Sequence, residues 1–410
     1  GDPNLEIDSV STDSRTAGKD SLFIPLKGEN FDGHDFIGNA IWDRAVGAVL
    51  TERPLSDTDK SRVAVVVADD TLKALQDMAA YNRRRYDIPI IAITGSSGKT
   101  TTKDMIYSVL SKKFNVLATE GNLNNEIGLP LTLLRLDGSH EVGVLELGMN
   151  HLGEIHKLAN ISLPDIGIIT NIGLSHIGEL GSQENIFKAK MELFDYRHSK
   201  TLAILNGDDP YLSQVDKHFL ARPIKYIGTG DNSFRAYDIE LKGDSGLSYN
   251  INIDGIEHTI ELTIPGLHNI YNSLFAIAIG YEFDIPMEDI KEALYKFKPG
   301  NMRLNIFETH NGVKVIDDVY NANPNSMEAA VSILEDIESK RKIAVLGDML
   351  ELGSYSKEAH RDLGKLVAKA GIDMLITKGD DSRFIGAGAR EEGMDIKHIY
   401  HFDCNKDVID

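Results

Sequence analysis

The sequence is poor in cysteine, in long apolar runs and in basic residues. Cys404 is the only cysteine among 410 residues, which excludes a disulfide framework and fits a reducing compartment. No apolar run approaches the about 20 residues that a bilayer span requires, so we expect no membrane insertion. With 43 Lys and Arg against 63 Asp and Glu, the net charge of −20 argues against a nucleic-acid partner. We therefore expect a soluble, cytoplasmic protein in which local donors hold any anionic ligand.

The length of 410 residues predicts two or three domains. The chain begins Gly1-Asp2-Pro3, with neither an initiator Met nor a signal-peptide pattern, so we expect the natural start to be missing or replaced. Residues 1–86 combine strand-like segments at 21–26 and 63–67 with a helical pattern at 71–85. We interpret them as a first, small α/β domain.

Residues 87–300 form the second predicted domain. Its apolar segments alternate with helical stretches, which predicts a mainly parallel sheet. The predicted strands are residues 90–93, 142–147, 166–170 and 202–205. Residues 225–265 instead alternate with a period of two between Gly-Asp turns, which indicates an antiparallel appendage.

Residues 301–410 form the third predicted domain. Strands are expected near residues 313–317, 342–346 and 374–377, separated by helices that begin at Asn325 and Ser356. The chain ends soon after a strand-like segment at 397–400, so we expect this domain to be incomplete. The fold class predicted from these patterns is α/β, in three domains.

A glycine-containing loop follows the first strand of the second domain. Residues 90–102 read IIAITGSSGKTTT, and an apolar stripe continues through Met105, Ile106, Val109 and Leu110. A strand, a turn and a helix in this order place backbone N–H groups and the positive helix end around an anion. Lys99 would reach the outer phosphates of ATP and Thr100 would offer its hydroxyl to Mg²⁺, as in a P-loop. The predicted ATP-binding loop comprises Gly95, Ser96, Ser97, Gly98, Lys99, Thr100 and Thr101.

This loop departs from the full P-loop pattern, because Ile93 occupies the place of the usual first glycine. One alternative is a surface turn that happens to contain Gly-Lys-Thr, although the strand and helix around it disfavour that interpretation. A GTPase would show Asn-Lys-x-Asp after a strand, and NKDV at residues 405–408 fails at its last position.

Polar segments also follow the later strands. They read EGNLNNEIGLP at 120–130, ELGMN at 146–150 and TNIGLSH at 170–176. Ligands bind at such strand ends in open α/β sheets. Glu146 is placed for a Mg²⁺ ligand, although a strand-end Glu is often merely solvated. His176, taken alone, is more typical of a hydrogen-bonded loop or core histidine than of a metal ligand.

Together with later motifs, these segments resemble the Mur ligases, the ATP-dependent amide-forming enzymes of peptidoglycan precursor synthesis. The later motifs are AKMELF at 189–194, NGDDP at 206–210, GLHNIYN at 266–272, MRL at 302–304 and DDVYNANP at 317–324. The resemblance covers essentially the whole chain, in order. VLGDMLELG at 345–353 resembles the branch that adds D-alanyl-D-alanine, and the Asp-Asn-Pro-Arg motif of a neighbouring branch is absent. A late Lys-Gly-Ser-Arg stretch expected of this branch is also missing, which favours a chain truncated at its C-terminus.

The resemblance implies a uridine-nucleotide domain at 1–86, an ATP-binding domain at 87–300 and a C-terminal Rossmann-like ligase domain at 301–410 that closes over the site. Its implied catalytic residues are Lys99, Lys190 and His176, and its implied ligands for two Mg²⁺ ions are Thr100, Glu146, His176 and Lys190. Lys190 would carry a carbamate derived from CO₂; without the resemblance it reads as a surface charge beside Glu192 and Lys188. The implied nucleotide contacts are Asn269, Asn272, Arg303 and Asp318.

The resemblance also implies the substrates UDP-MurNAc-tripeptide and D-Ala-D-Ala, and we expect a monomer. The implied UDP-substrate residues are Ser14, Arg15, Lys27, Phe31 and His34, of which Phe31 or His34 would supply a stacking face. Asn321 and Asn325 are the acceptor candidates.

Alternatives that stay open are a sister Mur-type or folylpolyglutamate-type ligase that adds one amino acid, and an ATP-gated binding module without ligase turnover. The sequence leaves open whether the third peptide residue is lysine or diaminopimelate.

Overall fold

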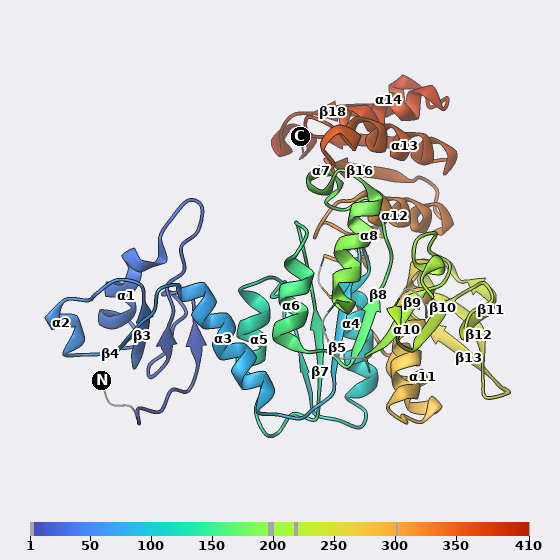
Figure 1. Cartoon of the computed structure of the whole chain (residues 1–410). Helices are drawn as coiled ribbons and strands as arrows, with labels where there is room; N and C mark the ends of the chain where they lie inside the picture. Colours follow the sequence, from blue (N-terminus) through green and yellow to red (C-terminus); the bar gives the residue numbers. More distant parts are fainter. Residues whose placement is uncertain (1–3, 196–200, 217–219, 301, 410) are drawn as a thin grey trace.

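The computed structural model describes residues 4–195, 201–216, 220–300 and 302–409. Three units follow one another along the chain, from the blue N-terminal unit through the central unit to the red C-terminal unit in Figure 1. Each unit contains its own parallel strands flanked by helices, which confirms the α/β fold class. In the described part of the chain, no helix combines the length and the apolar character needed to cross a membrane.

The N-terminal unit is built on a four-stranded sheet in the order β1-β2-β3-β4, with all pairs parallel. Its strands are β1 (Val10–Ser11), β2 (Leu22–Phe23), β3 (Ala48–Thr51) and β4 (Ala64–Val67), and its short helices are α1 (Ile37–Trp42) and α2 (Asp57–Lys60). The strand-like segments at 21–26 and 63–67 are confirmed. Apolar side chains pack on both faces of this sheet, so the unit has a core of its own.

Helix α3 (Thr71–Arg84) joins this unit to the central one. Asp70 caps the helix by accepting a hydrogen bond from Lys73 N, and the far end packs on α5 (Gly128–Leu134) and α6 (Glu154–Ser162). Near that end the buried Arg83 donates to the carbonyl oxygens of Ser162 (2.8 Å), Tyr86 (2.7 Å) and Ile88 (3.1 Å). A helix predicted to end the first domain therefore also contributes to the core of the second.

The central sheet has nine strands in the order β13-β12-β11-β10-β9-β8-β5-β7-β6. Its first six strands are β5 (Ile90–Thr94), β6 (Val116–Ala118), β7 (Val142–Glu146), β8 (Ile166–Ile169), β9 (Leu202–Asn206) and β10 (Ile224–Gly228), all parallel. The strands β11 (Phe234–Leu241), β12 (Leu247–Ile253) and β13 (Ile256–Leu262) form the predicted antiparallel appendage. One detail of the prediction is wrong, because β10, inside the predicted appendage, pairs parallel with β9 and extends the main sheet.

Both faces of this sheet are buried at its parallel centre, in β5, β7 and β8. Along β5, Ile90 and Ala92 point into one apolar cluster and Ile91 and Ile93 into another, which explains the uninterrupted apolar run. The helices α4 (Lys99–Leu110), α10 (His268–Glu282) and α11 (Met287–Tyr295) contribute to the second cluster. The helices α5, α6 and α8 (Gln183–Met191) contribute to the first, with the short α7 (Ile177–Leu180) above them.

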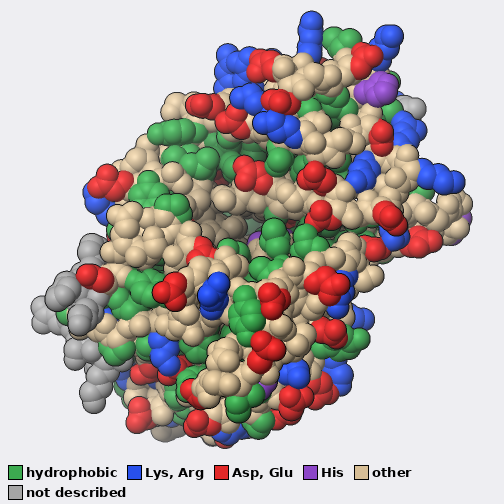
Figure 2. Space-filling view, turned by 90° about the vertical axis from the view of Figure 1, so that its right-hand side faces the viewer, with side chains coloured by type: hydrophobic (Ala, Val, Ile, Leu, Met, Phe, Trp, Pro, Cys, Tyr) green, Lys and Arg blue, Asp and Glu red, His purple; other side chains and the backbone are tan. Residues whose placement is uncertain are grey.

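The C-terminal unit has a three-stranded parallel sheet, β16-β17-β18, and a separate hairpin. Its strands are β14 (Asn305–Glu308), β15 (Lys314–Asp317), β16 (Ile343–Gly347), β17 (Met374–Lys378) and β18 (Ile399–Phe402). Its helices are α12 (Pro324–Asp336), α13 (Ser356–Lys369), α14 (Arg383–Glu391) and α15 (Asn405–Ile409). The strand predicted at 313–317 exists, but it pairs antiparallel with β14 instead of joining the larger sheet. On the face seen in Figure 2, acidic and basic side chains are interspersed.

Replacing Arg83 by Leu should lower the free energy of unfolding by about 3 kcal/mol, because buried carbonyl oxygens lose their donor. Urea denaturation followed by circular dichroism would measure this. Arg84→Leu, on the exposed side of the same helix, is the matched control and should stay within about 0.5 kcal/mol of the parent. Equal stability of the two variants would contradict the anchoring role of Arg83.

Candidate active site

The loop after β5 positions the first turn of α4 at the edge of a cavity. Gly98 precedes the helix in the left-handed conformation (φ 77°), and a Cβ there would lie 2.7 Å from Asn272 Oδ1, so a side chain does not fit. No side chain caps α4 within the described chain, which leaves its first N–H groups available to a ligand. The geometry is that of an anion-binding helix terminus.

The segment after β8 holds this loop in place. Asn171 Oδ1 accepts from Ser97 N (3.0 Å), Thr170 Oγ1 donates to Ser97 O (2.6 Å), and Ser96 Oγ accepts from Gly173 N (2.8 Å). Polar residues predicted to bind ligand at this strand end therefore also orient the neighbouring glycine loop.

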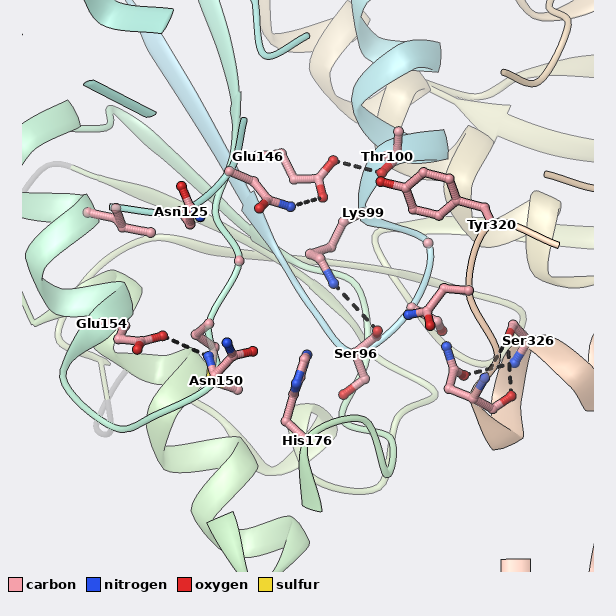
Figure 3. A pocket seen from close by; sticks show the side chains of 18 of the residues that line it. Ser96, Lys99, Thr100, Asn125, Glu146, Asn150, Glu154, His176, Tyr320 and Ser326 are labelled. Carbon is pink, nitrogen blue, oxygen red and sulfur yellow. Dashed lines mark hydrogen bonds between the residues drawn. The ribbon is translucent and has the colours of Figure 1, made fainter. Parts of the chain in front are cut away.

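Lys99 lies in the cavity, where its ammonium donates to Gly95 O (2.8 Å) and, over a longer distance, to Ser96 O (3.5 Å; Figure 3). Burial lowers the pKa of Lys99; the Glu146 carboxylate opposes this shift and the Arg303 guanidinium adds to it. A second anionic group in the cavity would favour the charged ammonium.

Glu146 ends β7 and is only 3% exposed, so it is not a merely solvated strand-end carboxylate. Its Oε2 accepts from Thr100 Oγ1 (2.8 Å; Figure 3), and its Oε1 accepts from Asn124 Nδ2 (2.8 Å). Within the described residues, no group of three or more His, Cys, Asp or Glu side chains could hold a metal ion by itself. A hydroxyl and one carboxylate nevertheless fit Mg²⁺, which takes few protein oxygens and completes its shell with water and phosphate oxygens.

Two adjoining cavities open around this loop. The first, of about 400 Å³, is lined by Lys99, Thr100, Glu146 and His176 of the central unit and by Tyr320 and Asn321 of the C-terminal unit. The second, of about 340 Å³, lies beyond Gly98. Arg303 and Asp318 line both cavities, so each cavity has walls from two units.

The second cavity is lined mainly by uncharged groups. Asn272 accepts from Thr102 Oγ1 (3.0 Å) and donates to Asn269 Oδ1 (3.0 Å), and both amides are buried. Burial lowers the pKa of the neighbouring His268 to about 4, so its ring is neutral near pH 7. His268 was not among the predicted site residues, although it precedes Asn269 in the motif GLHNIYN at 266–272. Neutral donors and acceptors beside Phe275 suit a heterocyclic base.

Arg303 and Asp318 face these cavities from the C-terminal side. The Arg303 guanidinium lies 3.8 Å from the centre of the Tyr320 ring, and Asp318 Oδ1 accepts from Leu304 N (3.1 Å). Burial raises the pKa of Asp318. The hydrogen bond from Leu304 N–H and the charge of Arg303 lower this pKa, but they do not cancel the effect of burial.

His176 lines the first cavity from the start of α7, with a left-handed backbone (φ 64°). Its Nδ1 lies 2.6 Å from Glu351 Oε2, too poorly aligned for a good hydrogen bond but close enough for an ion-pair contact. Burial lowers the pKa of His176, with Glu351 opposing the shift and Lys190 and Lys99 adding to it. Glu351 was not among the predicted site residues; its only signal was its place in VLGDMLELG.

Lys190 is 1% exposed, so the alternative of a surface charge is wrong. No hydrogen bond from its ammonium to a described residue is found. Burial lowers the pKa of Lys190 well below its usual value, and the nearby Lys99 lowers it further. An amine in these surroundings is readily neutral and hence nucleophilic.

The five residues predicted for the UDP-substrate lie away from both cavities, in the N-terminal unit. Ser14 is half-buried; Arg15, Lys27 and Phe31 are exposed, and Arg15 pairs with Asp13 (2.7 Å).

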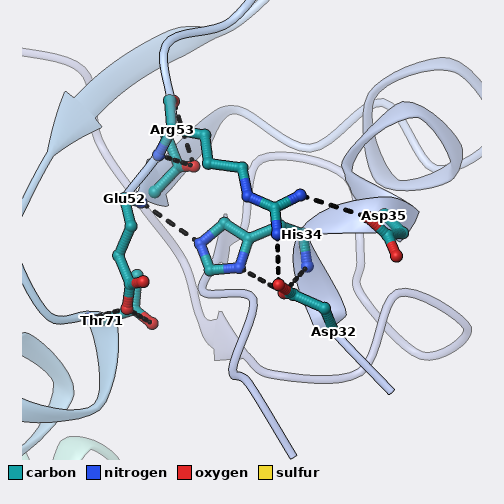
Figure 4. Close-up of polar contacts among 7 residues, drawn as sticks. Asp32, His34, Asp35, Glu52, Arg53 and Thr71 are labelled. Atoms are coloured by element: carbon teal, nitrogen blue, oxygen red, sulfur yellow. Dashed lines mark hydrogen bonds and ion pairs between the residues drawn. The ribbon is translucent and has the colours of Figure 1, made fainter.

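The stacking role predicted for His34 is wrong. Its ring is buried, with Nδ1 2.6 Å from Asp32 Oδ1 and with Nε2 accepting from Glu52 N at 3.2 Å (Figure 4). His34 thus links the loop at Asp32 to the residue that follows β3, Glu52. Arg53 pairs with Asp32 on the outside of this cluster. Phe31, with 65% of its surface exposed, is the aromatic ring left for stacking.

The two acceptor candidates are not brought together. Asn321 lines the first cavity, whereas Asn325 lines the second, beside Asn269 and Asn272. The side chain of Asn325 also approaches Gly173, where an added Cβ would lie 2.4 Å from its Oδ1. Asn321 is thus the candidate on the side of Lys99 and Glu146.

Comparison with known proteins gives matches along the whole chain. Family models described as Mur ligase family, catalytic domain, Mur ligase middle domain, and Mur ligase, glutamate ligase domain match residues 6–83, 93–280 and 302–410. The UDP-N-acetylmuramoyl-tripeptide–D-alanyl-D-alanine ligase of Bacillus subtilis is 40% identical over 405 residues, which cover 98% of this chain and 86% of that protein.

Two solved structures are similar over nearly the whole chain. MurF from Acinetobacter baumannii matches with a TM-score of 0.90 at 33% identity, over 99% of this chain and 86% of that one. The MurF ligase from Thermotoga maritima, solved in complex with ADP, matches with a TM-score of 0.86 at 26% identity, over 99% and 90%.

Glu146→Gln should weaken Mn²⁺ binding in the presence of ATP by about tenfold or more, because the amide keeps the shape of the side chain but lacks its charge. Electron paramagnetic resonance of free Mn²⁺ would measure the affinity. Glu141→Gln, exposed before the start of β7, serves as the matched control. Unchanged Mn²⁺ affinity in Glu146→Gln would rule out Glu146 as a ligand.

Proposed function

The chain belongs to the Mur ligase family, and from that premise we propose that it is an ATP-dependent ligase that joins D-alanyl-D-alanine to UDP-MurNAc-tripeptide in peptidoglycan precursor synthesis. The substrates are those in the names of its relatives in Bacillus subtilis and Escherichia coli. The observation that carries the proposal is a cavity that combines a phosphate-type loop, the oxygens of Thr100 and Glu146, and the cationic Arg303 of another unit.

The first step activates the tripeptide. A carboxylate is a poor electrophile, so its terminal oxygen attacks the γ-phosphorus of ATP, the bond from phosphorus to the ADP oxygen breaks, and an acyl phosphate forms. Lys99, Arg303 and the N–H groups of α4 stabilise the negative charge on the transferring phosphoryl group, where positioning and electrostatics supply most of the acceleration. Mg²⁺, bound by Thr100 and Glu146, would further neutralise the phosphate oxygens.

The second step forms the amide. The amine of D-Ala-D-Ala attacks the acyl carbon, the bond from carbon to the phosphate oxygen breaks, and inorganic phosphate leaves while the amine loses a proton. We assign Asn321 to the acceptor side of the first cavity, and Asn269, Asn272, Asp318 and Asn325 to the nucleoside side. In the N-terminal unit, Ser14, Arg15, Lys27 and Phe31 are the proposed UDP contacts, with hydroxyl, cationic and aromatic groups suited to uracil and pyrophosphate.

Two other functions would use the same fold. A sister ligase would add a single amino acid, and folylpolyglutamate synthase from Mycobacterium tuberculosis shares the fold at 15% identity. An ATP-gated binding module would release phosphate, if at all, independently of a peptide acceptor. The relatives' names favour the dipeptide ligase over both.

The decisive measurement is phosphate release from ATP with UDP-MurNAc-tripeptide, with and without D-Ala-D-Ala, alongside mass detection of the pentapeptide product. Release should require both substrates and match product formation. Lys99→Ala should lower turnover by about 10²- to 10³-fold. Lys112→Ala, which removes only a surface ion pair with Glu292, should leave it unchanged. Acceptor-independent release would favour the binding module, and product with single amino acids would favour the sister ligase.

We further propose that Lys190 carries the carbamate. Its burial and lowered pKa favour the neutral amine that reacts with CO₂, and the product would add a carboxylate-like group near Lys99 and His176. With ¹³C-bicarbonate, ¹³C NMR should detect an adduct that disappears in Lys190→Ala, together with about a hundredfold loss of turnover. Lys188→Ala, exposed on the same helix, is the matched control. No adduct and a fully active Lys190→Ala would refute the assignment.

A further inference from the structure

Residues 348–353, here termed the docking loop, follow β16 and are anchored firmly in the C-terminal unit. The Asp348 carboxylate accepts three backbone hydrogen bonds at the loop before α14, from Asp380 N (3.0 Å), Asp381 N (3.1 Å) and Ser382 N (2.7 Å). Asp348 thereby pairs with backbone N–H groups that would otherwise lack acceptors in the loop between β17 and α14.

The middle of the docking loop is fixed by burial and by one further hydrogen bond. Met349 N donates to Nε2 of the fully buried His360 (3.0 Å), and the side chains of Met349 and Leu352 are each 1% exposed. Between them, Glu351 has a left-handed backbone (φ 62°) that turns it out of the C-terminal unit. Such a conformation costs about 1 kcal/mol or more in a residue other than glycine, so the surroundings must hold it.

Glu351 meets the central unit at α7, which lies under the C-terminal unit in Figure 1. Glu351 O accepts from Gly178 N (2.9 Å), and Tyr355 OH donates to Gly181 O (3.4 Å). A Cβ on Gly178 would lie 2.7 Å from Glu351 O and 2.8 Å from Gly353 N, so this approach of two backbones is possible only at glycine. The φ of Gly178 lies outside the left-handed region, so alanine is excluded there by the docking loop alone.

The side chain of Glu351 reaches the residue that begins α7. Its Oε2 lies 2.6 Å from His176 Nδ1, a buried atom, while the His176 ring lines the first cavity (Figure 3). Because Nδ1 faces this carboxylate, Nε2 is the ring nitrogen left for the cavity. Carboxylates that contact the far nitrogen of a functional histidine fix both its tautomer and its orientation.

We propose that the docking loop fastens the C-terminal unit to α7 and that Glu351 is the positioning residue that orients His176 in the same contact. Docking of one unit and alignment of a side chain in the other are then a single event. The segment VLGDMLELG (345–353) resembles the branch that adds D-alanyl-D-alanine. On this proposal the same segment serves the assembly of the cavity. The kinetic part rests on the proposed function, whereas docking and ring orientation do not.

Gly178→Ala tests docking in the full chain without substrates. Amide hydrogen exchange of the segment 176–181, measured by mass spectrometry, should accelerate by about tenfold, because Gly178 N loses its acceptor across the interface. Gly138→Ala, at a glycine with open space around it and an ordinary φ, is the matched control and should exchange like the parent. Unchanged exchange in Gly178→Ala would overturn docking through this loop.

Glu351→Ala and Glu351→Gln test positioning. Both variants retain a Cβ, so the left-handed backbone at position 351 costs about the same in each. Only the glutamine side chain offers His176 an oxygen. Glu351→Ala should lower kcat by about tenfold with KM for ATP within about twofold, and Glu351→Gln should restore most of the loss. Glu358→Gln, which removes an exposed charge from α13, should leave both constants unchanged. Equal losses in the two Glu351 variants would overturn the positioning role.

A third readout needs no turnover. The ¹⁵N resonances of the His176 ring should report one tautomer, protonated on Nδ1, in the parent and in Glu351→Gln, and a mixture in Glu351→Ala. If the parent does not turn over but the exchange and the tautomer change as expected, the proposed function fails and the docking loop stands. If the parent turns over and none of the three readouts changes, the docking loop fails alone.

Discussion

The site depends on one constraint: both faces of the sheet are buried at β5, β7 and β8, so polar side chains can emerge there only where these strands end. Because β5, β7 and β8 are parallel neighbours, their carboxyl ends meet at one edge. The end of β5 supplies the glycine loop and Lys99, the end of β7 supplies Glu146, and the segment after β8 supplies the hydrogen bonds that hold the loop. Burial of these strands thus determines where the glycine loop, Lys99 and Glu146 lie, independently of any ligand.

Charge gives the cavity its preference for an anion in a strongly acidic protein. Lys99 and Arg303 bring positive charge to the glycine loop, while Glu146 and three further carboxylates line the same cavity. The pKa of Lys99 is lowered because burial disfavours its charged form, and the nearby Arg303 charge adds to that cost. A triphosphate lowers that cost, so affinity for a phosphate-bearing ligand follows from the arrangement itself. The overall charge of −20 has little influence at such short range, because surface charges are screened by salt.

Local features of this site could be predicted from the sequence, and long-range ones could not. The apolar run before Gly95 and the stripe after Lys99 specify a strand, a turn and a helix, because periodicity is a local property. The contact of His176 with Glu351 and the burial of His34 depend on segments far apart in the chain, whose distances no local pattern encodes. The same reason explains the separation of Asn321 from Asn325: they are close in sequence, but the start of α12 directs them into different cavities.

An acyl phosphate imposes a further demand, because water competes with the amine for its carbon. A cavity built within one unit would have to stay open for two large substrates and would therefore stay wet. Walls from two units would resolve this conflict if the units separated to admit the substrates and met again to exclude water. The docking loop is suited to such a role because it meets α7 through the hydrogen bond from Gly178 N to Glu351 O and through the contact of Glu351 with His176, beside an apolar cluster that both units share. Under the proposal, alignment of His176 would then be confined to the state in which the two units meet.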